Sequence, residues 1–153
     1  MSMAGEFLFV DTNILLSATD RSRALHGACL NVLSEIPRAG AHLVVNAQVL
    51  REYLVVSTRP VDVNGLGLTA AQSLDNVAAF KERMNLLNEN DRVHESLMGL
   101  VRRHKLKGKR IHDANIVATM AAHGIERLIT ADVKDYKIFK GIMVQAPGEF
   151  ESK

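Results

Sequence analysis

Four acidic residues lie in a pattern that an alternating strand and helix chain would gather at one place: Asp11, Glu52, Asp113 and Asp132. Carboxylates crowded into one pocket repel one another, and a divalent cation is the natural means of neutralising them. An oxygen-rich pocket suits Mg²⁺ or Mn²⁺, which can activate water and stabilise charge on a scissile phosphate. The pattern therefore predicts phosphodiester hydrolysis, with Asp11 and Asp113 as the firmest metal ligands. Asp132 comes next, and Glu52 binds directly or through water.

Each acid also has a purely structural interpretation. Asp11 could cap a helix, and Asp113 could complement a helix dipole. Glu52 could be solvated, and Asp132 could stabilise a turn. The joint occurrence of the four acids, within the motifs described below, favours the chemical interpretation.

The elements that would position these acids alternate along the chain. Apolar runs predict strands, and helical periodicity with capping residues predicts the helices between them. The strands are expected at 7–10, 42–45, 84–87, 127–130 and 142–145. The helices are expected after residue 11 and at 23–36, 47–56, 70–83, 91–105 and 112–122. Such alternation predicts an α/β/α sandwich of three layers with a central, mostly parallel five-stranded sheet, in one domain over 1–153.

The acids fall at functional positions of that fold. Open α/β sheets bind ligands beyond the carboxyl ends of their strands. Asp11 and Asp132 follow directly from predicted strands, Asp113 lies in the first turn of a helix, and Glu52 lies at the edge of an apolar helix face. All four can converge if the first and fourth strands are neighbours.

The motifs around the acids resemble the PIN-domain family, particularly VapC-type ribonuclease toxins. The resemblance rests on VDTNILL, REYL, HDANIVATMAAHGI and ITADVKDYKIF, which together extend over nearly the whole chain. It implies that the acidic quartet binds the metal and that Thr12, Asn13 and Thr130 are polar neighbours of it. Asp135 could be a fifth acidic neighbour or a turn residue. In one departure, Tyr136 stands where phenylalanine is more usual, which preserves an aromatic anchor.

The resemblance implies an endoribonuclease that depends on Mg²⁺ or Mn²⁺ and serves as the toxin of a toxin–antitoxin module. RNA is then the substrate, and a homodimer held by a cognate antitoxin is expected. Two alternatives stay open: an RNA-processing or RNA-binding PIN-domain protein without a toxin role, and an aspartate-nucleophile phosphatase. The phosphatase is disfavoured because Asn13 stands where that superfamily usually carries a second aspartate.

A basic run, RRHKLKGKR at 102–110, precedes the helix that carries Asp113. Its cations could hold RNA phosphates as the backbone enters the acidic pocket, or they could form a solvated helix end. His112 could contact phosphate, although capping or surface packing explains it as well. The RNA-binding candidates are Arg103, Lys105, Lys107, Lys109 and Arg110.

Composition excludes several other classes of protein. The net charge of +2 permits nucleic-acid binding without requiring it. The single cysteine, Cys29, excludes an intrachain disulfide, and no Cys/His spacing suggests zinc. No apolar run approaches the roughly 20 residues that span a bilayer, and no signal peptide pattern opens the chain. The expected location is a reducing cytoplasm, away from membranes.

Overall fold

A five-stranded sheet forms the middle layer of the computed structural model, which describes residues 2–150. Its strands are β1 (Phe7–Val10), β2 (His42–Asn46), β3 (Asn85–Leu87), β4 (Arg127–Ile129) and β5 (Met143–Gln145). Their order is β3-β2-β1-β4-β5, and each neighbouring pair is parallel. The predicted parallel sheet is confirmed, and β1 lies beside β4, with Val10 opposite Ile129.

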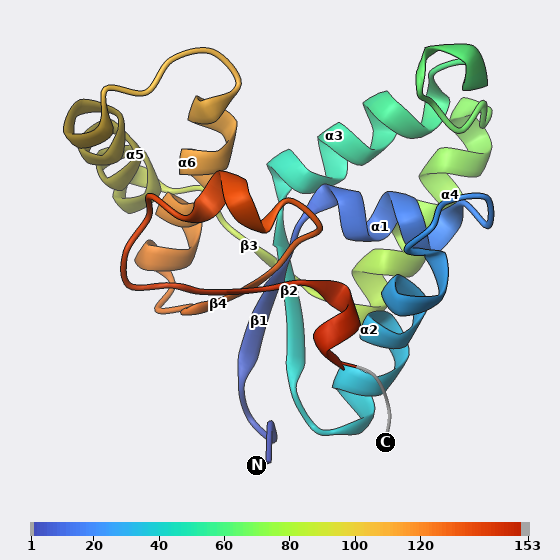
Figure 1. Ribbon diagram of the computed structural model, residues 1–153, viewed down its shortest axis with the longest axis horizontal. Helices are drawn as coiled ribbons and strands as arrows, with labels where there is room; N and C mark the ends of the chain where they lie inside the picture. Colours follow the sequence, from blue (N-terminus) through green and yellow to red (C-terminus); the bar gives the residue numbers. More distant parts are fainter. Residues whose placement is uncertain (1, 151–153) are drawn as a thin grey trace.

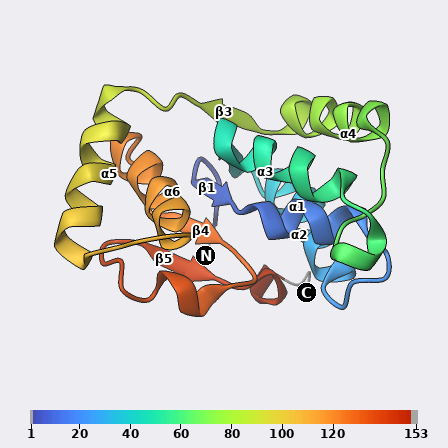
Figure 2. The same cartoon turned by 90° about the horizontal axis from the view of Figure 1, so that it is seen from above.

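Helices cover both faces of the sheet, as the predicted sandwich requires. The helices α1 to α4 lie on one side and α5 and α6 on the other (Figures 1 and 2). Their bounds are α1 (Thr12–Thr19), α2 (His26–Arg38), α3 (Ala47–Thr58), α4 (Ala70–Arg83), α5 (Asp91–His104) and α6 (Arg110–Ala122). Short 3₁₀ helices add η1 (Val61–Val63), η2 (Val133–Tyr136) and η3 (Pro147–Phe150).

Side-chain caps explain where several helices begin. Asn46 ends β2 and accepts a hydrogen bond from the Val49 N–H, so the strand passes directly into α3. Thr69 and Gln72 form a reciprocal capping box at the start of α4. The central strand β1 is buried from Leu8 to Val10, as expected for a parallel sheet covered on both faces.

Several helix boundaries differ from the predicted ones, including the end of α3, which is Thr58 instead of residue 56. Helix α2 begins at His26, because residues 21–25 form turns, and it includes Pro37 before ending at Arg38. A proline in the last turn breaks few backbone hydrogen bonds, so the helix continues one residue beyond it. Helix α6 begins at Arg110 instead of His112, which makes the end of the basic run part of the helix.

Helix α5 lies outermost in the molecule and packs mainly on α6 (Figure 2). Of the five residues predicted on its inner side, Val93 is buried and the other four are only half-buried, because α5 lies over α6 rather than directly on the sheet. Those four are Leu97, Leu100, Val101 and His104. None of the helices within residues 2–150 has both the length and the apolar character needed to cross a bilayer.

Candidate active site

The predicted acids lie at the carboxyl end of the sheet. Asp11 follows β1, and its backbone N–H donates to the carbonyl of Ile129 in the neighbouring strand β4. Asp132 lies just beyond β4, while α3 supplies Glu52 and the first turn of α6 supplies Asp113. The adjacency of β1 and β4 therefore brings together residues that are far apart in sequence.

Asp11 is the best-anchored acid, with 7% of its surface exposed. Its Oδ1 accepts a hydrogen bond from the Thr12 N–H at 2.8 Å. Its Oδ2 accepts hydrogen bonds from the hydroxyls of Thr130, at 2.8 Å, and Tyr136, at 3.1 Å. The Asn13 amide is more distant, 3.5 Å from Oδ2. The carboxylate is thus fixed from three separate segments of the chain.

Asn13 connects Asp132 to the start of α1. Its amide nitrogen donates to the Thr130 hydroxyl and to Asp132 Oδ2, both at 3.1 Å. Its carbonyl oxygen accepts from the Ala131 N–H at 3.0 Å. Asn13 and Thr130, both predicted as polar neighbours of the quartet, therefore determine where the loop after β4 lies.

Glu52 is held by two donors and linked through one of them to α6. The Thr12 hydroxyl donates to its Oε2 at 2.9 Å, and the Gln48 amide donates to its Oε1 at 2.8 Å. Gln48, only 2% exposed, also donates to the His112 carbonyl at 3.1 Å and accepts from the Asn115 amide at 2.6 Å. Sequence reasoning missed Gln48, although its position one helical turn before Glu52 was a usable signal.

Asp113 is paired with the last residue of the basic run. Its Oδ2 lies 3.5 Å from Arg110 Nε, and Arg110 Nη2 donates to the Asp135 carbonyl at 2.7 Å. Arg110 therefore lies against the acids, whereas Lys107 and Lys109 are exposed. The other exposed basic candidates are Arg103 and Lys105. The His112 side chain is exposed, and its backbone carbonyl accepts the hydrogen bond from Gln48 of α3.

Burial and mutual repulsion leave negative charge poorly compensated in this site. Burial raises the pKa of Asp11 to about 6, with a further contribution from Glu52, although hydrogen bonds from Thr130 and other donors oppose the shift. Burial also raises the pKa of Asp113 to about 6, and the charge of Asp11 adds to the effect while Arg110 opposes it. A nearby positive charge would stabilise the ionised form of both carboxyls.

The donor set suits a hard divalent cation in its chemistry. Carboxylate oxygens are the ligands that Mg²⁺ and Mn²⁺ prefer, and the raised pKa values mark charge that such an ion would neutralise. Within residues 2–150, however, no three His, Cys, Asp or Glu side chains are close enough to form a complete metal-binding group. Hydroxyl and amide donors occupy oxygens of Glu52 and Asp132, so the acids share a region without converging on one point.

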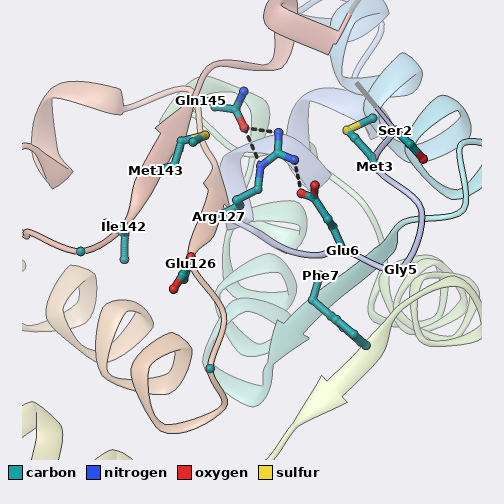
Figure 3. A pocket seen from close by; sticks show the side chains of 12 residues that line it. Ser2, Met3, Gly5, Glu6, Phe7, Glu126, Arg127, Ile142, Met143 and Gln145 are labelled. Carbon is teal, nitrogen blue, oxygen red and sulfur yellow. Dashed lines mark hydrogen bonds and ion pairs between the residues drawn. The ribbon is translucent and has the colours of Figure 1, made fainter.

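A large hollow lies at the opposite end of the sheet, beside the amino ends of β1, β4 and β5. Figure 3 shows Arg127 there between Glu6 and Gln145. The guanidinium pairs with Glu6, and its Nε and Nη2 donate to Gln145 Oε1 at 3.1 and 2.6 Å. These polar groups satisfy one another and are remote from the acids.

Comparison with known proteins identifies the family. The model of the PIN domain matches residues 8–139, a segment that contains all four acids. The chain belongs to the PIN domain family. No curated protein sequence matches it closely enough to count as a relative.

Several solved structures share the fold. VapBC2 from Rickettsia felis, bound to a DNA fragment from its promoter, is 16% identical with a TM-score of 0.68, covering 92% of this chain and 98% of that one. A toxin–antitoxin complex from Klebsiella pneumoniae is 23% identical with a TM-score of 0.64, covering 92% and 97%. Mycobacterium tuberculosis VapC20, a toxin that cleaves the sarcin–ricin loop, is 20% identical with a TM-score of 0.57, covering 79% and 86%.

Proposed function

We propose that this protein is a divalent-metal-dependent endoribonuclease and the toxin of a toxin–antitoxin module. The observation that carries the proposal is the pair Asp11 and Asp113, carboxyls from different layers of the sandwich whose pKa values are both raised to about 6. Membership of the PIN domain family supports a nuclease, and the solved structures that share the fold include a toxin that cleaves the sarcin–ricin loop.

Asp11 and Asp113 would hold the ion, together with Asp132, and Glu52 would contact it directly or through water. Bound Mg²⁺ or Mn²⁺ supplies an activated water and neutralises charge on the scissile phosphate. The surrounding residues orient these ligands. Asn13 and Thr130 hold Asp132 and Asp11, whereas Gln48 and Thr12 hold Glu52. Asp135, which is exposed and contacts Arg110 through its carbonyl, would contribute charge at the rim.

The substrate would enter along the basic run. Arg103, Lys105, Lys107 and Lys109 are exposed just before α6, and their charges would offset the repulsion between phosphates and carboxylates. Arg110 would contact both the substrate phosphate and Asp113, since it already lies beside Asp113. Phosphate contacts of this kind position an RNA without specifying its sequence.

The partners follow from the same proposal. A small, separately encoded antitoxin would cover the acidic pocket with a basic side chain, and the toxin would act in the cytoplasm as a homodimer. The toxin–antitoxin complexes among the related folds support this assignment. Co-purification with a protein that suppresses cleavage tests it. Harmless expression without such a protein would favour the alternative, a PIN-domain protein that processes or binds RNA.

The deciding experiment maps cleavage sites on total RNA with Mg²⁺, Mn²⁺ or chelator, using Asp11→Asn as the matched control. Asparagine keeps the shape of the side chain and removes its charge. Discrete cuts that require both the ion and Asp11 are expected. Cutting that survives both the chelator and the substitution would refute the metal mechanism. Release of phosphate from monoesters without RNA cleavage would instead favour the phosphatase.

A further inference from the structure

A second group of cations lies in the segment 133–140, just beyond Asp132. Lys134, Lys137 and Lys140 are exposed there. This segment and the basic run at 102–110 together hold nine of the 19 Lys and Arg residues of the chain and one of its 17 Asp and Glu residues, Asp135. Within residues 2–150, Arg110 is the only one of these nine cations that pairs with an acid. The two segments therefore concentrate unpaired positive charge.

The two segments lie against each other in the fold. Arg110 Nη2 donates to the Asp135 carbonyl at 2.7 Å. The ring of His104, the last residue of α5, meets that of Phe139 edge-on, with centroids 5.5 Å apart. Arg103 and Lys140 also line one cleft of the surface. The segments thus form one continuous basic face, which lies toward the β5 edge of the sheet (Figure 2). Its exposed cations are Arg102, Arg103, Lys105, Lys107, Lys109, Lys134, Lys137 and Lys140.

The opposite flank of the acid site, beside β3, has the reverse charge. Glu89 and Asp91 follow β3 and are exposed. Glu89 accepts a hydrogen bond from Asn115 of α6, two residues beyond Asp113, so this flank also adjoins the site. Residues 88–95 contain three acids and one cation, Arg92. Because β3 and β5 are opposite edges of the sheet, the quartet lies between a negative flank and a positive one.

We infer that the basic face binds RNA phosphates on one side of the scissile bond, and that Lys134, Lys137 and Lys140 extend this contact beyond the basic run. The inference rests on the proposed function and adds a direction to it. A polyanion would be attracted toward β5 and repelled from Glu89 and Asp91.

The chemistry of the basic face favours RNA over a protein partner. Phosphate contacts require cations alone, whereas the centre of a protein interface is more apolar. In the segments 102–110 and 133–140, the exposed large apolar side chain is Ile138 alone, with 40% of its surface exposed. The face therefore offers charge without an apolar centre.

Fluorescence anisotropy of a labelled, mixed-sequence single-stranded RNA tests the face in chelator, where binding is measured without metal-dependent cleavage. Replacing Lys134, Lys137 and Lys140 with alanine should lower the slope of log K against log salt by up to about 2, because each phosphate contact on a single strand contributes about 0.7. The matched control loses the same charge from three exposed cations outside the face and should keep the wild-type slope. These control residues are Arg51, Lys81 and Arg92.

The direction is tested with an RNA whose cut has been mapped, shortened from either end. Removing nucleotides on one side of the cut should raise KM about tenfold with kcat nearly unchanged, and removing them on the other side should change KM little. In the lysine variant, the long and short substrates should have similar KM values. Equal effects from the two ends would overturn one-sided binding.

The binding results also separate this inference from the nuclease proposal. An unchanged salt slope in the folded lysine variant, or an equal loss of slope in the control variant, would overturn the inference while RNA cleavage by the wild type still stands. RNA binding that depends on the three lysines without any cleavage would retain the basic face and refute the proposed function. Binding of polyglutamate in preference to RNA would assign the face to an acidic protein and overturn the inference.

Discussion

Neutral donors, rather than cations, hold most of the acidic side chains in place. Hydroxyls and amides contact Asp11, Glu52 and Asp132, and Arg110 is the cation paired with an acid of the quartet. Neutral donors fix the orientation of a carboxylate without cancelling its charge. The site is therefore ordered and still short of positive charge, which is the arrangement that a metal-binding role requires.

Removing one of these charges should stabilise the metal-free protein. Because the pKa of Asp113 is raised to about 6, its ionised form destabilises the folded state, and the penalty is fully present above that pH. In the presence of chelator at pH 7.5, Asp113→Asn should raise the free energy of unfolding by on the order of 1 kcal/mol. The thermal midpoint should rise by about 2–4 °C. RNA cleavage should be lost in the same variant.

The stability advantage of Asp113→Asn over the wild type should shrink as the pH falls from 7.5 towards 4, because wild-type Asp113 takes up its proton over that range. Glu95→Gln, an exposed acid on α5, serves as the control and should leave the midpoint unchanged. A destabilised Asp113→Asn at every pH would mean that the Arg110 pair outweighs the repulsion.

At the scale of secondary structure, Gln48 joins two helices that carry acids. It contacts Glu52 on its own helix and the His112 carbonyl on α6. Gln48→Met keeps the approximate size of the side chain and removes the hydrogen bonds of Gln48 with Glu52, the His112 carbonyl and Asn115. Scanning calorimetry should show a loss of about 1–3 kcal/mol, and cleavage per folded molecule should fall about tenfold.

Ser57→Ala is the comparison for Gln48→Met, because it removes a different buried contact of α3, the one with Ser73 on α4. It should cost stability without lowering cleavage by the folded fraction. A similar fall in cleavage for both variants would attribute the effect of Gln48 to the general stability of α3.

The segment between α5 and α6 should provide a salt-dependent contact with RNA. Replacing Lys105, Lys107 and Lys109 with alanine should weaken binding and reduce the slope of log K against log salt by up to about 2, since each phosphate contact on a single strand contributes about 0.7. Filter binding over a salt series measures the slope. Lys81→Ala, an exposed lysine on α4, should not alter it, and an unchanged slope in the triple variant would remove this segment from the interface.

Local signals in the sequence predicted the elements best where caps were explicit. The predicted span 70–83 matches α4, because Thr69 and Gln72 form the capping box. The start of α2 was predicted too early, at Arg23, because the apolar pattern that begins at Leu25 was extended backwards into a turn that Asp20 and Ser22 hold by hydrogen bonds. Such competition between a turn and a helix depends on contacts that periodicity does not record.

The acids were predictable because their residue types and their positions after strands agree with one chemistry. The spacing of Gln48 and Glu52 hinted at their contact within α3, but the link from Gln48 to α6 and the contact of the Tyr136 hydroxyl were not predictable, for a shared reason. A glutamine in a helix resembles a surface residue, and a tyrosine resembles an apolar anchor, until the fold shows what each side chain contacts. Gln48 reaches the His112 carbonyl, 64 positions away, and Tyr136 reaches Asp11, 125 positions away.

At the scale of the whole molecule, an ion at the site would connect the two helical layers. Asp11 caps α1 and Asp113 belongs to α6, and these two helices lie on opposite sides of the sheet (Figure 1). Mg²⁺ at about 100 times its dissociation constant should therefore stabilise the fold by about 2.7 kcal/mol, or about 5–10 °C in thermal midpoint. Asp11→Asn should respond little, and an equal response in this variant would locate the stabilising ion elsewhere.

The pairing of β1 with β4 also determines when, during translation, the acidic site can form. Asp11 leaves the ribosome early, whereas the hydroxyl that holds it, on Thr130, is 119 positions further along the chain. During most of translation, the nascent polypeptide therefore lacks part of the acidic site. The ribosome that synthesises it would then not be exposed to a complete nuclease site. Nascent chains stalled before Arg127 should leave RNA intact even with Mg²⁺, and cutting by such chains would show that the first three acids, Asp11, Glu52 and Asp113, suffice.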